Sequence, residues 1–281
     1  MHEAQYALHA DLEDRHWWFA GRRTIVKRLI SRLVPAASVV IDVGCGTGAT
    51  AASLSPPFTC VGLDDSPDAI AHARARFPAV EYDCEHDVGK RAPLFARAGA
   101  VLLMDVLEHV EDDFHLLSEI LALIPTGAHV LITVPAEPAL WTVHDESFGH
   151  WRRYDMERLR ATWQGLAVDE RLLSAFNARL YPVVRSVRAI SKLRSRPAGT
   201  AGTDLGMPPA LANRWLEQLF AGEGVALERA IDRGGSPAYA RGVSLIAVLR
   251  KRDDTVVPRA KPPGLPPDLW DPTRSTTRAG S

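Results

Sequence analysis

Short apolar segments alternate with helix-like segments through the first half of the chain. Runs rich in β-branched and other apolar residues predict buried strands at 38–43, 58–63, 79–82, 100–104 and 128–134. Segments with helical composition or spacing lie between these runs, at 49–54, 67–77 and 113–123. Such alternation is typical of a parallel sheet that helices cover on both faces.

The remaining elements are predicted from the same patterns. An amphipathic helix precedes the first strand and ends before Pro35, because proline cannot continue a helix. Ser66 and Pro67 are typical N-cap and first-turn residues of the helix at 67–77. Residues 136–153 show no period, and beyond them we expect helices at 156–163, 179–193 and 210–220 and strands at 167–173 and 242–249.

These elements divide the chain into four regions. We expect an N-terminal helical cover at 1–37, a Rossmann-like α/β domain at 38–175 plus 241–251, a helical cap at 176–240 and a flexible tail at 252–281. The tail is rich in Pro, Asp, Arg and Thr, with too little apolar content for a core. The segment at 136–165 is expected to contribute to the cap.

Composition and charge exclude several classes of protein. Among the 281 residues, 46% are hydrophobic and 24% charged, which excludes collagen-like, coiled-coil and wholly disordered chains. The formal net charge of −1 removes a general electrostatic attraction to nucleic acid or anionic lipid. Three cysteines without CxxC spacing predict neither a disulfide framework nor a zinc site. The polar, acidic N-terminus and the short apolar runs predict a soluble, cytoplasmic protein.

A glycine loop follows the first strand, in the sequence Asp42-Val43-Gly44-Cys45-Gly46-Thr47-Gly48. Glycines there allow positive φ and a close approach of the backbone to a ligand. Asp64 ends the next strand, where a carboxylate suits a ribose diol. Asp42 would repel a pyrophosphate, so the loop suits a ligand with a cationic end and no phosphate. S-adenosylmethionine is such a ligand, and the GxGxG spacing also differs from the GxGxxG of dinucleotide-binding loops.

Four motifs in this order resemble those of the class I S-adenosylmethionine-dependent methyltransferases. They are DVGCGTG at 42–48, VGLDDSP at 61–67, MDVLEHV at 104–110 and ALIPTGAHVLITVP at 122–135. The resemblance covers about residues 38–135 and implies a Rossmann-like, seven-stranded, mostly parallel sheet with an antiparallel last strand. It also implies helices on both faces, a helical cap insertion, and S-adenosylmethionine bound across the carboxyl ends of the first strands.

A narrower resemblance concerns a bacterial subgroup of these enzymes that acts on small molecules. Its marks are HWWF at 16–19, followed by Arg22 and Arg23, and the segment LWTVHDESFGHWRRYDMERL at 140–159. In this subgroup the N-terminal helix covers the cofactor, so Trp18 or Arg22 is expected to touch the adenosyl group or the carboxylate.

The family resemblance also implies roles for the motif residues. The glycine loop, with Gly44, Cys45, Gly46 and Gly48, would face the methionine part, and Asp42 would lie near its ammonium group. Other expected contacts are Asp64 with the ribose, Asp65 beside the adenine and Asp105 beneath the cofactor. The acid that contacts adenine after the third strand stays open among Asp83, Glu85 and Asp87, with Asp87 favoured.

Several titratable residues are candidates for proton transfer from the methyl acceptor. His109 lies where an acceptor would approach the methyl group, or it caps the helix that begins after Asp112. His144 or His150 could be a general base, and Tyr154 is a further candidate. Two other interpretations of this segment are metal ligation by His144, Asp145 and His150, and a lid loop held by Asp145, His150, Arg152 and Arg153. Methyl displacement needs no metal, and none is predicted.

We therefore expect in-line methyl transfer to an oxygen or nitrogen of a small molecule, with S-adenosylhomocysteine as the product. The expected acceptor is moderately hydrophobic because the cap carries apolar residues together with Trp141, Trp151 and Trp163. Two alternatives are an S-adenosylmethionine-binding protein that does not methylate and an RNA or protein methyltransferase. No nucleic-acid partner and no membrane insertion are expected, although the basic stretch at 179–196 leaves peripheral membrane contact open. The oligomeric state stays open.

Overall fold

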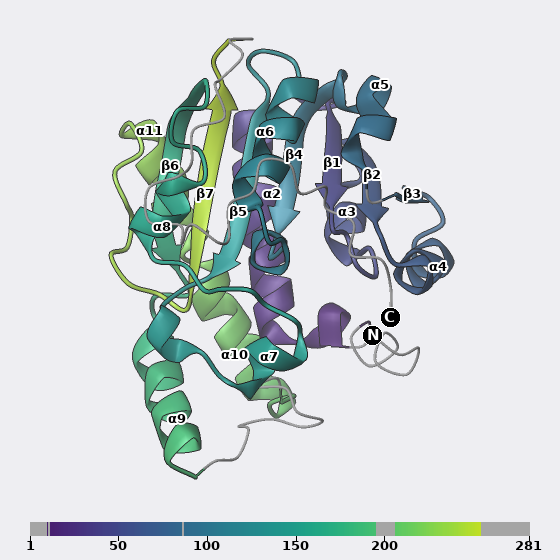
Figure 1. Cartoon of the computed structure of the whole chain (residues 1–281). Coiled ribbons are helices and arrows are strands. Elements are labelled where there is room, and N and C mark those ends of the chain that lie inside the picture. The colour runs from purple at the N-terminus through teal and green to yellow at the C-terminus, as the bar shows by residue number, and fades with distance from the viewer. Residues whose placement is uncertain (1–9, 11, 86, 195–205, 254–281) are drawn as a thin grey trace.

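The computed structural model describes residues 10, 12–85, 87–194 and 206–253 (Figure 1). A seven-stranded sheet forms its centre, in the order β3-β2-β1-β4-β5-β7-β6. The strands are β1 (Val39–Val43), β2 (Thr59–Asp64), β3 (Glu81–Cys84), β4 (Ala98–Met104), β5 (His129–Pro135), β6 (Val168–Phe176) and β7 (Ser244–Lys251). β1 to β5 pair in parallel, and β7 runs antiparallel to both β5 and β6. The predicted fold class is confirmed.

Helices cover both faces of the sheet. The described α-helices are α2 (Trp17–Leu33), α3 (Ala49–Leu54), α4 (Pro67–Arg76), α5 (Ala92–Phe95), α6 (Asp113–Leu123), α7 (Val143–Ser147), α8 (Met156–Ala161), α9 (Tyr181–Arg194), α10 (Ala210–Ala221) and α11 (Gly224–Asp232). Three 3₁₀ turns, η1 (Val88–Arg91), η2 (Leu107–His109) and η3 (Pro138–Leu140), lie among the described residues. None of the helices in this part of the chain is both long and apolar enough to cross a bilayer.

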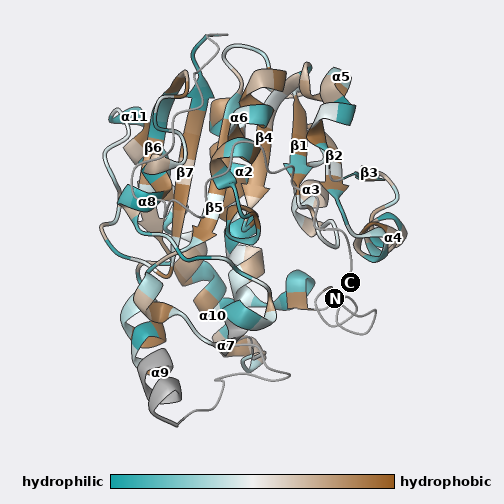
Figure 2. Ribbon diagram, in the orientation of Figure 1, coloured by the Kyte–Doolittle hydropathy of each residue, from teal (hydrophilic) through white to brown (hydrophobic). Residues whose placement is uncertain are grey.

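The alternation of side chains along each strand separates two hydrophobic cores. Val40 of β1 packs with α2, α3, α4, α10 and α11 on one face, whereas its neighbour Ile41 packs with α5, α6 and α8 on the other. Figure 2 shows the strands as the apolar centre of the molecule. The helices therefore fold onto the sheet to remove both of its faces from water.

Helix α10 extends the layer on the α2 face. Phe220 is fully buried and packs edge-on against Trp17 and obliquely against Phe176, with ring centroids 5.9 and 5.6 Å apart. A side chain at Gly21 would collide with Phe220, since a Cβ there would lie 2.6 Å from its ring. Asn213 caps the start of α2 by accepting a hydrogen bond of 2.9 Å from the Trp17 amide. The predicted cap region is therefore joined to the N-terminal helix.

Local turn geometry explains where the predicted boundaries were wrong. Strand β3 begins two residues later than predicted, because the chain turns at Val80, whose amide donates to Phe77 O. Helix α11 was not predicted, since Gly222 and Gly224 at its start resemble a loop. The unperiodic segment 136–153 contains η3 and α7. The tail predicted at 252–281 lies outside the described residues except for 252 and 253.

The Phe220→Ala variant is expected to lose about 3–5 kcal/mol of unfolding free energy, because removing a buried aromatic ring leaves a cavity. The control is Leu211→Ala on the same helix, where the side chain is 87% exposed. That change should stay within about 0.5 kcal/mol of the wild type. Urea unfolding followed by circular dichroism measures both variants. Equal stability of the two would contradict the described packing of α10.

Candidate functional site

The glycine loop between β1 and α3 is held against β2. The amides of Gly44 and Cys45 both donate to Leu63 O, at 2.8 and 3.0 Å. Gly46 has a φ of +54°, and a Cβ added there would meet nothing within 4 Å. A side chain at Gly48 would instead collide with the Tyr82 ring. The backbone at Gly46 is thus the part of the loop that a ligand can approach closely.

Asp42 is a buried acid that lacks a matching partner. Its side chain is 1% exposed, and neither carboxyl oxygen completes a hydrogen bond. Burial raises its pKa to about 7, against the opposing effects of the Arg22 charge and the nearby Ala51 amide. An unpaired buried carboxyl group is costly to the folded protein. It is therefore available to a ligand that brings a positive charge or hydrogen-bond donors.

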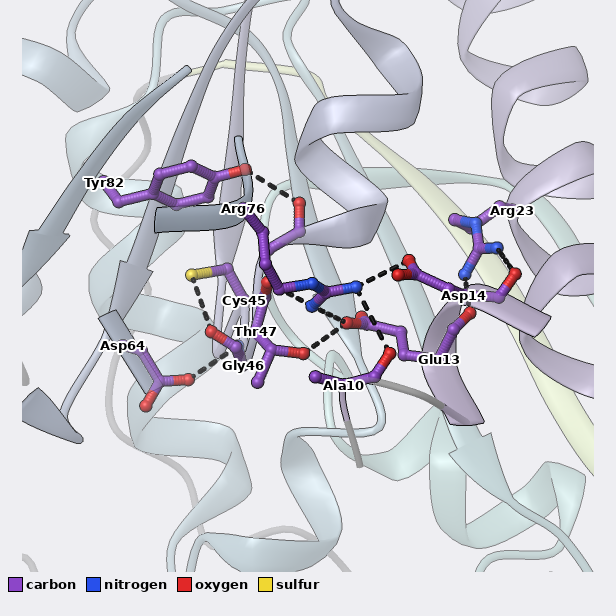
Figure 3. A network of polar contacts seen from close by, with 11 residues as sticks. Ala10, Glu13, Asp14, Arg23, Cys45, Gly46, Thr47, Asp64, Arg76 and Tyr82 are labelled. Carbon is purple, nitrogen blue, oxygen red and sulfur yellow. Dashed lines mark hydrogen bonds and ion pairs between the residues drawn. The ribbon is translucent and has the colours of Figure 1, made fainter. Parts of the chain in front are cut away.

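Asp64 connects the end of β2 to the glycine loop. It accepts hydrogen bonds from the amides of Gly46 and Ser66, at 2.8 and 3.0 Å, and the first of these is visible in Figure 3. Burial raises the pKa of Asp64. The neighbouring Asp65 is exposed at the same end of the strand. Two of the predicted cofactor-binding acids thus lie next to the loop.

The three acids around the end of β3 each have a protein partner. Asp83 forms an ion pair with Arg91 at 2.8 Å. Glu85 accepts from the Asp87 amide, at 3.0 Å. Asp87 itself caps η1 by accepting from the Gly89 amide at 2.9 Å, and it is exposed. These contacts do not single out one acid for adenine.

A network of charged groups ties the N-terminal segment to the glycine loop (Figure 3). Glu13 is buried, and it accepts hydrogen bonds from the Thr47 hydroxyl and, at 3.0 Å, from Arg76. Arg76 also donates to Thr47 O at 2.7 Å and pairs with Asp14 at 2.6 Å. Sequence reasoning missed this network. Among the described residues, the sequence signal for this network was the pair of adjacent acids, Glu13 and Asp14, before the HWWF motif.

Arg22 brings the N-terminal helix to the other side of the site. It is 7% exposed, forms a hydrogen-bonded ion pair with Asp105 and has its guanidinium carbon 4.6 Å from the centre of the Trp18 ring. Its Nε has no hydrogen-bond partner. Asp105 follows β4 with a φ of +59° and accepts from the Thr133 hydroxyl at 3.2 Å. Trp18, Arg22 and Asp105, all predicted as cofactor residues, are therefore brought together.

A second cluster lies beyond Asp105, where η2 meets the segment after α7. One ligating atom from each of Glu108, His109 and His150 lies within 4.8 Å of the others. Glu108 is 1% exposed and its Oε2 has no partner, whereas His109 reaches solvent. The two imidazole rings meet edge-on with centroids 4.7 Å apart. His109 and His150, two of the predicted proton-transfer residues, are therefore neighbours.

Burial governs the protonation of this cluster. It raises the pKa of Glu108 well above its usual range, with a further contribution from Asp105. Desolvation by the surrounding protein and the neighbouring His150 lower the pKa of His109, although the residue as a whole is exposed. Both groups are therefore favoured in their uncharged forms.

Asp145 anchors the segment that carries His150. Its carboxylate lies 2.9 Å from His150 Nδ1 and 2.8 Å from Arg153. Burial alone would raise the pKa of Asp145, but the contacts with His150 and Arg153 outweigh it and lower the pKa below its usual range. Arg152 instead donates to the carbonyl groups of Val110 and Glu111, both at 2.7 Å. Hydrogen bonds thus link Asp145, His150 and Arg153 to one another, whereas Arg152 holds the segment to the residues after η2. The lid-loop interpretation stays a prediction.

Two other predicted proton-transfer residues are placed differently. Tyr154 has no exposed surface, and its hydroxyl donates to Asp113 at 2.8 Å, which is also bound by Arg158. Burial raises its pKa well above the usual range. This buried position does not suit contact with an acceptor. His144 belongs to α7, but its side chain lies outside the described residues.

Comparison with known proteins decides the family. A family model described as a methyltransferase domain matches residues 18–180, more than half of the chain. The chain belongs to this methyltransferase family. The methyltransferase is an enzyme that uses S-adenosylmethionine as its cofactor.

Two relatives illustrate the range of similarity. Trans-aconitate 2-methyltransferase of Paracidovorax citrulli is 28% identical over 267 residues, covering 89% of this chain and 96% of that protein. A probable S-adenosylmethionine-dependent methyltransferase of Mycolicibacterium smegmatis is 30% identical over 126 residues, covering 44% of this chain and 48% of that protein. In the second match this chain spans about half the length of its relative.

Two solved structures share the fold. One is a putative methyltransferase in complex with the Haloferax volcanii Trm112 methyltransferase activator, with a TM-score of 0.53 and 17% identity over 89% of this chain and 95% of that one. The other is the plantazolicin methyltransferase BamL, with a TM-score of 0.53 and 11% identity over 89% and 91% of the two chains. At these identities the likeness concerns the fold alone.

The residues at the carboxyl ends of β1, β2 and β4 fit the cofactor. The unpartnered carboxyl group of Asp42 matches an ammonium group, and the open backbone at Gly46 allows a close approach. The unpartnered Nε of Arg22 matches a carboxylate. The orphaned polar groups therefore have the charges that a zwitterionic amino acid requires.

The Asp42→Asn variant tests the cost of burying this acid. In the wild type the folded-state pKa of about 7 lies above the ordinary value of 3.8. The unfolded chain therefore releases the proton first, and this group's contribution to stability falls as the pH rises from about 4 to 7. Asparagine does not titrate, so the variant does not lose this stability as the pH rises. Its unfolding free energy relative to the wild type should therefore increase by about 2–3 kcal/mol from pH 5 to pH 8. Urea unfolding of the cofactor-free proteins measures the difference.

The charges that act on Asp42 come from Arg22 on α2, Glu13 before α2 and Asp64 on β2. All three stay in place in the variant. Asp68→Asn, at an exposed acid in the first turn of α4, is the matched control and should show no such increase. A stability difference for Asp42→Asn that is the same at both pH values would contradict the raised pKa.

Proposed function

We propose that the methyltransferase methylates an oxygen or nitrogen of a small molecule that contacts Glu108, His109 and His150. The observation that supports this proposal is the position of the cluster. β1 and β4 are paired neighbours, so their carboxyl ends bring Asp42 and Asp105 to one edge of the sheet. The cluster follows Asp105 directly through η2 and is open to solvent at His109.

In this proposal the chain binds the cofactor along that edge. S-adenosylmethionine supplies a methyl group on a sulfonium that serves as leaving group. The glycine loop, with Gly44, Cys45, Gly46 and Gly48, holds the methionine part, and Asp42 faces the ammonium group. Asp64 binds the ribose, Asp65 and Asp87 flank the adenine, and Trp18, Arg22 and Asp105 close the side next to α2.

The acceptor proposed here is a hydroxyl or amine rather than a carboxylate. The cluster contains two histidines and one glutamate, and the arginines near it are paired, Arg22 with Asp105, Arg152 with Asp113 and Arg153 with Asp145. A carboxylate would therefore find no arginine reserved for it at the cluster. His109 and His150 are the residues that we retain for proton transfer from the acceptor, with His144 as a further candidate on α7.

The cap tryptophans support a moderately hydrophobic acceptor only in part. Trp163 packs in the core on the α6 face, so it is removed from this argument. Trp151 is 40% exposed, and its amide donates to Glu108 O at 2.7 Å. Trp141 is partly exposed and donates to Glu146. Trp151 therefore carries most of the support for an apolar surface beside the cluster.

We also propose that the chain belongs to the bacterial small-molecule subgroup with the HWWF motif. Supporting contacts link the motif to the site, since His16 caps α2 by accepting from the Trp18 amide at 3.3 Å. Trp18 also packs edge-on against Phe19, with centroids 4.8 Å apart. The motif residues therefore shape the helix that carries Arg22.

A trans-aconitate-like carboxylate is the second candidate acceptor, because the relative of that name matches over 89% of this chain.

Asp64→Asn should weaken binding of S-adenosylmethionine and S-adenosylhomocysteine about 10- to 100-fold, because charge-assisted hydrogen bonds to the ribose are lost. Calorimetric titration measures the dissociation constants. Asp68→Asn is the control, at an exposed acid four residues after Asp64, whose carboxylate accepts the hydrogen bonds from Gly46 and Ser66. An unchanged dissociation constant for Asp64→Asn would contradict the proposed binding of the ribose by Asp64.

The acceptor class is tested by measuring S-adenosylhomocysteine formation with a panel of small alcohols, phenols, amines and carboxylic acids, trans-aconitate included. We expect turnover with hydroxyl or amine acceptors, and a higher rate for apolar members of each class. Mass spectrometry of the product identifies the methylated atom. Turnover confined to carboxylic acids would overturn the proposed acceptor and favour the second candidate.

A further inference from the structure

The cluster formed by Glu108, His109 and His150 has the donor set of a transition-metal site. It offers two imidazole nitrogens and one carboxyl oxygen within 4.8 Å of one another. Two histidines and one carboxylate are a recurring set of three protein ligands for Zn²⁺ and for non-haem Fe²⁺. Mg²⁺ and Ca²⁺ prefer all-oxygen sites. The donor chemistry therefore favours a divalent transition metal.

Both histidines have the supporting contacts that metal-binding imidazoles use. His150 Nδ1 lies 2.9 Å from the Asp145 carboxylate, and the His109 ring hydrogen-bonds the Phe148 backbone. In metal sites the second ring nitrogen is typically held by a carboxylate or a carbonyl group in this way, which orients the ligating nitrogen. Asp145 is itself fixed by Arg153 at 2.8 Å and by the Thr142 amide at 2.8 Å.

Glu108 supplies an independent observation. Its side chain is 1% exposed, and its Oε2 is buried without a hydrogen-bond partner. A buried carboxyl oxygen without a partner is costly, and a cation would satisfy it. The Trp151 amide donates to Glu108 O at 2.7 Å, so the backbone that carries Glu108 is held beside His150. The buried oxygen and the oriented histidines thus converge.

We propose that Glu108, His109 and His150 bind a divalent transition-metal ion such as Zn²⁺, which coordinates the methyl acceptor. Ligand atoms around tetrahedral zinc are about 3.4 Å apart, so side-chain rotations that move these atoms by about 1 Å close the site. His109 is exposed to solvent, so a further ligand can approach the cluster there. This ligand set differs from the sequence-based alternative, because Asp145 supports His150 instead of binding the ion.

The role of the ion rests on the proposed function. An acceptor hydroxyl on the open side of the ion would have a lowered pKa and would lose its proton to solvent. Its oxygen would then form the bond to the methyl carbon while the carbon–sulfur bond breaks and its electron pair stays on sulfur. In this arrangement the two histidines act as ligands, and proton removal does not require either of them as a base.

The test is metal binding by the full chain after treatment with EDTA. We expect calorimetric titration with Zn²⁺ to show one site of micromolar or tighter affinity. Glu108→Gln, His109→Gln and His150→Gln should each weaken it at least tenfold. Asp145→Asn should weaken it about 10- to 100-fold through His150. The control is His115→Gln, at a partly exposed histidine of α6 paired with Glu119, which should leave the affinity unchanged.

A spectroscopic readout separates binding at this cluster from weak surface binding. Titration with Co²⁺ should give intense visible absorption bands of a four- or five-coordinate ion, and these bands should disappear in the three ligand variants. Circular dichroism of each variant establishes that it is folded. No stoichiometric Zn²⁺ binding, or equal binding by the wild type and the folded ligand variants, would overturn the metal site.

The same preparations distinguish this inference from the proposed function. Titration of the metal-free wild type with S-adenosylhomocysteine reports on the cofactor site alone. Cofactor binding and full turnover in the metal-free enzyme would overturn the metal proposal and leave the proposed function standing. Stoichiometric Zn²⁺ binding without methyl transfer to any small acceptor would overturn the proposed function and retain the ion-binding site.

Discussion

The convergence of three acidic side chains, one of them fully buried, at one edge of a parallel sheet is the constraint on which this site depends. Asp42 lies within β1, Asp64 ends β2 and Asp105 follows β4, and because these strands run in the same direction their acids meet at the same edge. Asp64 is held by backbone amides and Asp105 by Arg22, but Asp42 completes no hydrogen bond. The edge thus retains a buried acid at a cost in stability, as expected where a binding site requires one.

The N-terminal helix compensates for this acidity, and its position depends on contacts at its start. Arg22 brings a buried guanidinium to Asp105 and lowers the pKa of Asp42, which burial raises. At its start α2 is capped by Asn213 of α10, while the preceding segment is held through Glu13 to Thr47 of the glycine loop. The position of Arg22 therefore depends on segments that are far apart in the sequence. The N-terminal helical cover, the helical cap and the glycine loop are therefore connected to one another.

The two sides of the site differ in chemistry. The side along β1 and β2 is acidic and contains backbone amides directed at carboxylates. The side beyond Asp105 presents two imidazoles and one buried carboxyl group, and Asp145, which is paired with Arg153, holds the imidazole of His150. Charge complementarity therefore favours a cationic ligand on the first side. Ligand coordination or proton transfer fits the second side, and the short turn η2 connects the two.

Local patterns were sufficient for the architecture. Buried strands, the glycine loop and the Ser66–Pro67 helix start are signals carried by neighbouring residues, so they could be read without knowledge of packing. The beginning of β3 and the existence of α11 were not predicted, because the apolar pattern does not reveal the local turn at Val80 and because the glycines at the start of α11 resemble a loop. Tyr154 looked available in the sequence, but tertiary contacts bury it fully, and its hydroxyl donates to Asp113.

The sequence by itself determined the fold class, the cofactor and the acids at the carboxyl ends of β1, β2 and β4. Each of these is marked within a few residues of a strand end. Only the tertiary structure decided that Glu13 and Arg76 hold the glycine loop, that Arg22 pairs with Asp105 and that His109 meets His150 beside Glu108. These partners lie dozens of residues apart, and their distances are set by how the helices pack on the sheet.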